Sequence, residues 1–140
     1  MSLSSKVVAG VAVLIVLIVS AVALSTAGLD STCVNQIAGQ FPSPDRNYQA
    51  LVFSRDCGAT TEFSAQISLL QAGASLTNHP GNLFIASSKG SQEVSSEIRV
   101  QWVGDRTLRI EHDVNARVFL ANPGVLGVTV IYAPSSRRAG

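Results

Sequence analysis

The sequence predicts an all-β fold, a compact antiparallel sandwich or partly open barrel of about seven short strands, preceded by one N-terminal transmembrane helix. Three observations lead to this prediction. One unbroken apolar stretch stands at the N-terminus, and helical periodicity is nearly absent after it. Short runs rich in β-branched and aromatic residues then recur between turn signals.

The apolar stretch covers residues 7–27, is uncharged, and is dense in Val, Ala, Leu and Ile. At about 1.5 Å per residue, a helix of this length spans roughly 30 Å, the thickness of a bilayer hydrocarbon core. Lys6 precedes the stretch, and the first charged residue after it is Asp30. The positive-inside rule therefore predicts a cytoplasmic N-terminus of residues 1–6 and an extracytoplasmic C-terminal domain. We expect a single-pass signal anchor that contacts the lipid bilayer through residues 7–27.

A cleaved signal peptide is the alternative interpretation of this stretch. Small residues at Ser25 and Ala27 suit a peptidase that cuts before Gly28, and the mature chain would then be secreted. A signal needs only about 7 to 15 apolar residues, so the longer run favours an uncleaved anchor.

The two cysteines, Cys33 and Cys57, both follow the apolar stretch. Two cysteines in an exported domain usually form one disulfide, and we expect that bond here. The loop it closes is worth roughly 3.5 kcal/mol in the chain-entropy model. A metal or redox pair is the alternative, but no histidine neighbours either cysteine. We expect no metal and no cofactor.

Charge indicates little about partners. The chain has 10 basic and 9 acidic residues, and one basic residue, Lys6, precedes the helix, so the exported part is formally neutral. No basic stripe is available for nucleic acid. A protein partner or a second copy of the chain is the expected contact besides the bilayer.

Turn signals divide the rest of the chain into a linker over residues 28–42, a β domain over 43–133 and a flexible tail over 134–140. The clearest hairpin has apolar and polar positions alternating on both sides of a turn at 104–106, which predicts one face on a core and one in water. The predicted strands cover residues 48–53, 64–70, 83–86, 98–103, 108–111, 117–120 and 125–132.

Residues 55–61, Arg-Asp-Cys-Gly-Ala-Thr-Thr, carry more residue-type specificity than a strand pattern requires. Together with the rest of residues 42–70, this block resembles a widespread family of small bacterial exported proteins of unknown function. Members have an N-terminal apolar segment or lipoprotein signal, a first cysteine before a Ser-Pro-Asp-Gly-like turn, and the same block. The likeness continues through 80–84 to 127–128 and covers most of the exported domain. It implies no activity, and Arg46-Asn47 replaces the Gly-Lys that the resemblance leads us to expect.

The block offers a charge pair, Arg55 and Asp56, the hydroxyls of Thr60 and Thr61, and a flexible backbone at Gly58. The favoured interpretation is structural: Arg55 and Asp56 end a strand, and the following residues turn the chain. The alternative is a ligand or catalytic site.

A threonine nucleophile would need an adjacent base, and the two imidazoles, His79 and His112, lack a catalytic spacing. We expect no catalytic residue and no enzyme. The predicted function is a membrane-anchored extracytoplasmic accessory or interaction module, as a subunit of a larger membrane complex or a self-associating assembly. The alternative is an exported small-ligand-binding protein or enzyme that uses the Arg55–Thr61 block. A pocket joining Thr60 to an imidazole would favour the alternative.

Overall fold

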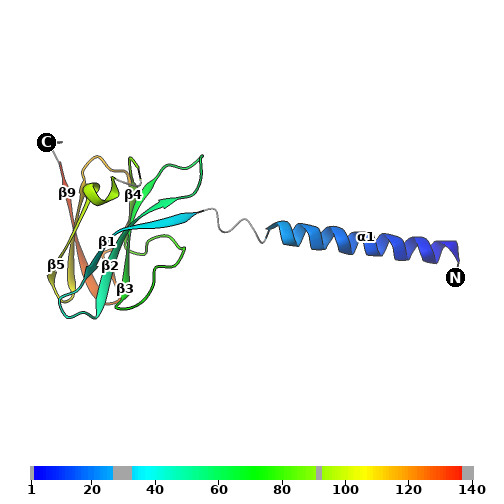
Figure 1. The fold of residues 1–140 in the computed structure, drawn as a ribbon, viewed down its shortest axis with the longest axis horizontal. Coiled ribbons are helices and arrows are strands. Elements are labelled where there is room, and N and C mark those ends of the chain that lie inside the picture. The colour runs from blue at the N-terminus through cyan, green and yellow to red at the C-terminus, as the bar shows by residue number, and fades with distance from the viewer. Residues whose placement is uncertain (1, 27–32, 91–92, 137–140) are drawn as a thin grey trace. The chain divides into compact units, whose positions relative to one another are not determined.

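The computed structural model describes residues 2–26, 33–90 and 93–136 of the chain (Figure 1). The chain divides into two compact units, Met1–Thr32 and Cys33–Gly140, and each is described by itself. The second is called the β unit below.

The first unit contains helix α1 (Leu3–Thr26). Its segment Leu3–Ala21 is long and apolar enough to span a membrane, with a mean hydropathy of 2.4 and no part buried against protein. The hydroxyl of Ser20 donates a hydrogen bond to the carbonyl of Val16 at 2.8 Å, so this polar group is satisfied within the helix. The predicted apolar N-terminal helix is confirmed. It begins before residue 7, and the predicted end at residue 27 lies outside the described residues.

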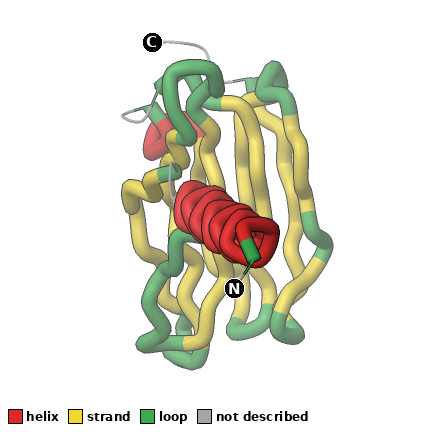
Figure 2. The backbone as a smooth tube through the Cα atoms, turned by 90° about the vertical axis from the view of Figure 1, so that its right-hand side faces the viewer, coloured by secondary structure: helices red, strands yellow, loops and turns green. Residues whose placement is uncertain are grey.

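The β unit is a sandwich of two sheets, which Figure 2 shows as yellow strands. The first sheet has the strand order β1-β2-β3-β4-β7, and the second has the order β5-β6-β9-β8. All pairs are antiparallel except β6 with β9, which is parallel. The all-β prediction is confirmed, with two sheets and no closed barrel among the described residues. The strands are β1 (Val34–Pro42), β2 (Tyr48–Asp56), β3 (Ser64–Gln71), β4 (Phe84–Ser87), β5 (Ile98–Gly104), β6 (Thr107–Asp113), β7 (Val118–Ala121), β8 (Gly124–Val125) and β9 (Val128–Ser135).

The core lies between the two sheets and follows from side-chain alternation along the strands. In the β5–β6 hairpin, Ile98, Val100, Leu108 and Ile110 are buried, as the sequence pattern predicted. They pack against residues from β2, β3 and β4 of the first sheet. That group comprises Ala50, Val52, Ala65, Ile67, Leu69, Phe84 and Ala86.

The strands β2 and β3 are buried on both faces, because a long connection covers the outer face of the first sheet. This connection, residues 72–83, is held by Gln49 Nε2, which donates to the Ala74 carbonyl at 2.8 Å. The Gly81 amide donates to Gln66 Oε1 at 2.6 Å, and both groups are buried. Leu51 and Phe53 are therefore buried on the face opposite the main core.

Two side-chain hydrogen bonds tie the sheets together at different edges. At the β1 and β5 edges, Trp102 Nε1 donates to the Phe41 carbonyl at 2.9 Å. At the β7 side, the Tyr132 hydroxyl of β9 lies 2.7 Å from the Asn122 carbonyl and 2.9 Å from the Leu83 carbonyl. Because a phenol has one proton, the two carbonyls share it.

The tie at Tyr132 gives an expected pH dependence. Burial raises the pKa of Tyr132 from 10.0 to about 12. The folded state therefore binds this proton more tightly than the unfolded chain, so the resulting stability is present below pH 10 and is lost as the pH rises from 10 to 12. In Tyr132→Phe this alkaline loss should disappear, and the free energy of unfolding at pH 7 should fall by about 1 kcal/mol. Urea unfolding at several pH values would measure both, and an unchanged alkaline slope in the variant would contradict the assignment.

The predicted linker over 28–42 is wrong for residues 34–42, which form β1. These residues pair with β2 from Val34↔Asp56 to Pro42↔Gln49. The segment escaped detection because β1 is an edge strand, mostly exposed, with a register shift between Ile37 and Gly39 that breaks the alternation. The remaining predicted linker residues, 28–32, lie outside the described residues.

Two further expectations change in the C-terminal half. The expected strand over 125–132 divides into β8 and β9 at Leu126 and Gly127, whose φ angles are 54° and 76°. β9 continues to Ser135, so the predicted tail over 134–140 begins too early, and residues 137–140 lie outside the described residues.

A short helix, α2 (Val94–Glu97), precedes β5 and places Val94 in the core. One helical turn is too short to show periodicity.

Candidate functional site

The end of the sandwich where the chain enters is closed by a disulfide between Cys33 and Cys57. Cys33 directly precedes β1 and Cys57 directly follows β2, so the bond joins neighbouring antiparallel strands at their ends. No described cysteine is free. The predicted pairing is confirmed. This end is called the entry end below.

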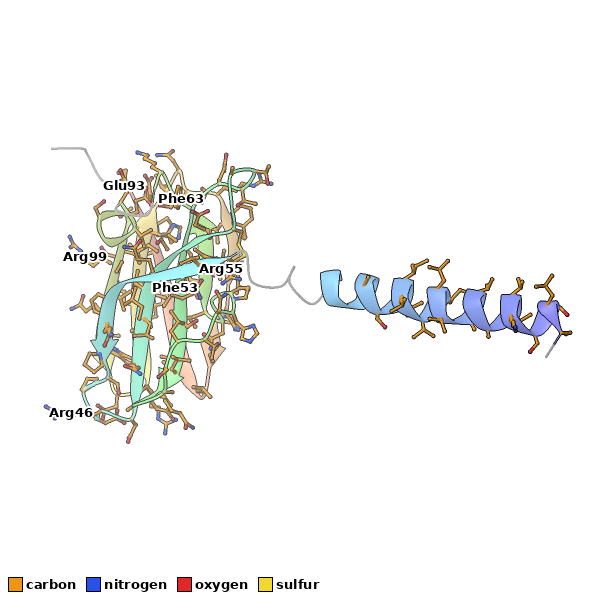
Figure 3. The ribbon with its side chains drawn as sticks, turned by 45° about the vertical axis from the view of Figure 1, so that its right-hand side comes forward. Arg46, Phe53, Arg55, Phe63, Glu93 and Arg99 are labelled. Carbon is orange, nitrogen blue, oxygen red and sulfur yellow. A yellow bond between two sulfur atoms is a disulfide. The ribbon has the colours of Figure 1, made fainter. Side chains whose placement is uncertain are left out.

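Arg55 belongs to a polar cluster beside the disulfide (Figure 3). Its Nη1 donates to Asn35 Oδ1 at 2.7 Å and to Asn78 Oδ1 at 3.2 Å. Asn35 Nδ2 donates to the carbonyls of Thr77 and His79, and Asn78 Nδ2 donates to the Cys33 carbonyl. The cluster therefore connects β1, β2 and the connection over residues 72–83.

The rest of the block turns the chain after β2. The Gly58 amide donates to Asp56 Oδ1 at 2.9 Å, and Gly58 has a φ of 108°, which a side chain would strain. The amide and hydroxyl of Thr61 both donate to the Gly58 carbonyl. Thr60 is exposed. Arg55 and Asp56 do not pair, because successive strand residues point to opposite faces; the one ion pair among the described residues joins Arg109 and Glu111 at 3.1 Å.

Among the described residues, neither imidazole forms a hydrogen bond with the hydroxyls of the block. His112 Nδ1 is 2.9 Å from the Asp113 carbonyl, and its ring centroid is 5.2 Å from that of Phe84. His79 is exposed in the connection over residues 72–83. The three cavities described next have neither imidazole nor Thr60 in their walls.

At the entry end is a cavity of about 550 Å³ that contains three carboxylates and one lysine. Both oxygens of Glu97 already accept hydrogen bonds, from the Ser88 hydroxyl at 2.7 Å and the Lys89 amide at 3.2 Å. Within the described part of the chain, no group of three or more His, Cys, Asp or Glu residues is arranged to hold a metal ion. The cavity is lined by Glu62, Phe63, Ser87, Ser88, Lys89, Glu97, Asp113, Asn115 and Ala116.

At the opposite end, where the β1–β2 and β5–β6 turns meet, lies a cavity of about 400 Å³. We call it the turn-end cavity; it is lined by Arg46, Asn47, Tyr48, Gln71, Ala72 and Arg106. The guanidinium carbon of Arg106 is 5.1 Å from the centroid of the Tyr48 ring, within cation–π range. The lining contains two arginines and no carboxylate. Sequence reasoning did not find this site, although Arg46 in place of an expected glycine was a signal.

A third, smaller cavity of about 320 Å³ lies between β1, β2 and the start of the connection over residues 72–83. Its walls are Ile37, Gln40, Gln49, Leu51, Gly73, Ala74, Ser75 and Leu76. It mixes apolar and amide side chains and brings no titratable group together.

No protein-family model matches this chain, and neither a curated protein nor a solved structure matches it. The fold itself defines the class: a disulfide-bonded β-sandwich protein with an N-terminal apolar helix. Such a helix fits a signal anchor or a signal peptide, and the disulfide indicates an oxidising, extracytoplasmic compartment.

Proposed function

We propose that this protein is a single-pass membrane protein whose β unit is an extracytoplasmic interaction module. The observation that carries the proposal is α1, in which Leu3–Ala21 is apolar and none of it is buried against protein. Apolar side chains on all sides of a helix require a hydrophobic environment, which a bilayer supplies. The helix has 24 residues, which is longer than the apolar region of about 7 to 15 residues that a signal peptide needs.

The orientation is supported by charge and by redox chemistry. Lys6 stands near the N-terminal end of α1 and would remain in the cytoplasm. The Cys33–Cys57 bond belongs in an oxidising compartment, on the other side of the membrane. Both features favour the same topology, with the β unit outside.

An interaction module is favoured over an enzyme by the state of the Arg55–Thr61 block. The guanidinium of Arg55 already bonds two asparagines, and Thr61 already donates to the Gly58 carbonyl. Thr60 is exposed on a turn, and a nucleophile there would need a base within hydrogen-bonding reach. We therefore assign the block a structural role, in which it stabilises the turn and the strand ends beside the disulfide, and not a catalytic one.

The sheet edges favour recognition through side chains over the addition of a partner strand. β1 has a register shift between Ile37 and Gly39, and β5 has one between Trp102 and Gly104. β7 carries an extra residue, Phe119, opposite β4, and β8 has only two residues. Bulges and short strands are the means by which proteins prevent pairing at an exposed edge. We therefore expect a partner, or a second copy, to dock on loops and faces.

Membrane fractionation tests the proposed topology. The full-length chain should stay in the membrane pellet after a sodium carbonate wash, and a tag placed after Gly140 should be digested by protease added from outside. The matched variant Ile15→Arg should lose membrane retention, because an arginine at the centre of a span costs about 2.5–3.5 kcal/mol on the insertion scale. Recovery of a soluble chain that begins near Gly28 would contradict the anchor and show that the N-terminal segment is a cleaved signal peptide. A tag protected from the protease would contradict the orientation.

A further inference from the structure

We propose that the turn-end cavity is a binding site for an oxyanion, a carboxylate or phosphate group, which Arg106 and Arg46 bind through their guanidinium groups. The site lies wholly within the β unit. The proposal therefore does not depend on whether α1 is an anchor or a cleaved signal.

Arg106 is held in position at the cavity by its surroundings. Its guanidinium lies over the Tyr48 ring at 5.1 Å, and its carbonyl accepts a hydrogen bond from the Thr129 amide at 2.9 Å. A Cβ atom at Gly127 would be 3.0 Å from Arg106 Nη1, so a glycine at that position leaves room for the guanidinium. A guanidinium that already lies over an aromatic ring loses less conformational entropy on binding an anion than a free side chain does.

No carboxylate is among the residues that line the turn-end cavity. The adjoining carboxylate, Asp45, is used inside its own turn. Its Oδ1 accepts from the Ser43 hydroxyl at 2.6 Å and the Asn47 amide at 3.1 Å, and its Oδ2 accepts from Asn47 Nδ2 at 2.7 Å. These hydrogen bonds, with a smaller attraction from Arg106, hold the pKa of Asp45 below its usual value. Neither cavity arginine takes part in an ion pair within the described residues.

Arg46 occupies a backbone conformation that favours glycine. Its φ is 58°, in the left-handed region, where a side chain costs about 1 kcal/mol or more. The strain is set by the turn, since the Arg46 amide donates to the Ser43 carbonyl and the Tyr48 amide donates to the Ser43 hydroxyl. Strain that persists at an exposed position suggests a use for the side chain.

In the proposed site, Arg46 supplies a second cation to the cavity that Arg106 also lines. Arg46 extends from the β1–β2 turn into solvent, at the end of the sandwich opposite to Phe63 and Glu93 (Figure 3). It forms part of the same cavity wall as Arg106. The side-chain amide of Gln71, for which no partner is recorded among the described residues, adds a neutral donor. Two guanidinium groups and an amide match the donor needs of a carboxylate or a phosphate.

The test is a titration of the full-length protein in maltoside micelles, followed by ¹H–¹⁵N NMR. One arm uses inorganic phosphate and the other acetate, both at constant ionic strength set with sodium chloride. We expect saturable shifts of the Arg106 side-chain Nε–H and of the Asn47, Tyr48 and Ala72 amides in at least one arm. The phosphate arm responding alone assigns a phosphate group as the ligand, and the acetate arm responding alone assigns a carboxylate.

Variants separate binding from folding. Arg106→Gln and Arg46→Gln should each raise the dissociation constant at least about tenfold, the effect of losing one charge-assisted contact. Arg46→Gly should weaken binding equally while raising the melting temperature, because glycine relieves the strain at φ 58°. Arg99→Gln, an exposed arginine on β5, is the matched control and should bind as the wild type does.

The proposal is overturned if neither anion produces saturable shifts, or if Arg99→Gln weakens binding as much as the two cavity variants. It is also overturned if Arg46→Gly folds and binds as tightly as the wild type. This last outcome remains decisive even if Arg106→Gln does not fold.

Discussion

Removal of the disulfide by the double substitution Cys33→Ser and Cys57→Ser should lower the free energy of unfolding of the β unit by about 2–5 kcal/mol. The two cysteines are 24 residues apart, and constraint of the unfolded chain by a loop of that length is worth roughly 3.5 kcal/mol. A small domain is stable by only about 5–15 kcal/mol, so this loss is a large share.

The loss should be concentrated in β1. Among the described strands, this edge strand pairs with β2 alone, and the disulfide lies at the end where the chain enters the β unit. Without the bond, the cluster of Asn35, Arg55 and Asn78 remains as the side-chain connection at that end. Hydrogen exchange should therefore accelerate more in β1 than in β6, which has a neighbour on each side.

The fluorescence of Trp102 provides the measurement for this prediction. It is the single tryptophan of the chain, and its indole donates to the Phe41 carbonyl of β1, so unfolding changes its environment. Denaturant unfolding of the wild type with a thiol reductant should reproduce the midpoint of the double serine variant. Equal midpoints for the oxidised wild type and the variant would show that the bond contributes nothing to stability.

Phe84→Ala should destabilise the β unit by about 3–5 kcal/mol, the usual cost of emptying a buried aromatic position. Phe84 is fully buried in β4, with ring centroids 5.2 Å from His112 and 5.8 Å from Tyr132 in the second sheet. The substitution leaves a void between the sheets and removes packing beside the Tyr132 tie. Thermal or denaturant unfolding would measure the loss.

The matched control is Phe119→Ala, at an exposed phenylalanine of β7 with 57% of its surface accessible. Its recorded aromatic contact is with Arg117, whose guanidinium carbon is 5.2 Å from the ring centroid. Such an exposed cation–π pair is worth about 0.5–1 kcal/mol, so the control should lose no more than that. Similar losses in both variants would mean that the sheets are not packed around Phe84.

Several features of this protein followed directly from local sequence. The length and hydropathy of α1 are properties of one continuous segment, and no tertiary contact is needed to recognise them. The β5–β6 hairpin was predictable because its alternation is regular and its turn at residues 105 and 106 is short. The disulfide was predictable because two cysteines allow one intramolecular pairing.

Features that depend on distant segments were missed. β9 pairs in parallel with β6 after the chain has crossed to the first sheet and back, and no local turn signals such a crossover. β1 lacks alternation because an exposed, bulged edge buries little. Leu51 and Phe53 are buried on the outer face only because the connection over residues 72–83 lies across it.

The Arg55–Thr61 block and the turn-end cavity differ in the same way, since one is local in sequence and the other joins distant residues. The Arg55–Thr61 block was visible as a continuous run of residues, and its local hydrogen bonds follow from the side chains that it contains. By contrast, the turn-end cavity joins Arg46 to Arg106 from two separate turns. The sequence by itself determined the apolar helix, the covalent bond and the local hairpin, because each depends on neighbouring residues or on a unique pairing. Only the tertiary structure decided the strand order, the covered faces and the shared cavity, because these depend on which distant segments pack together.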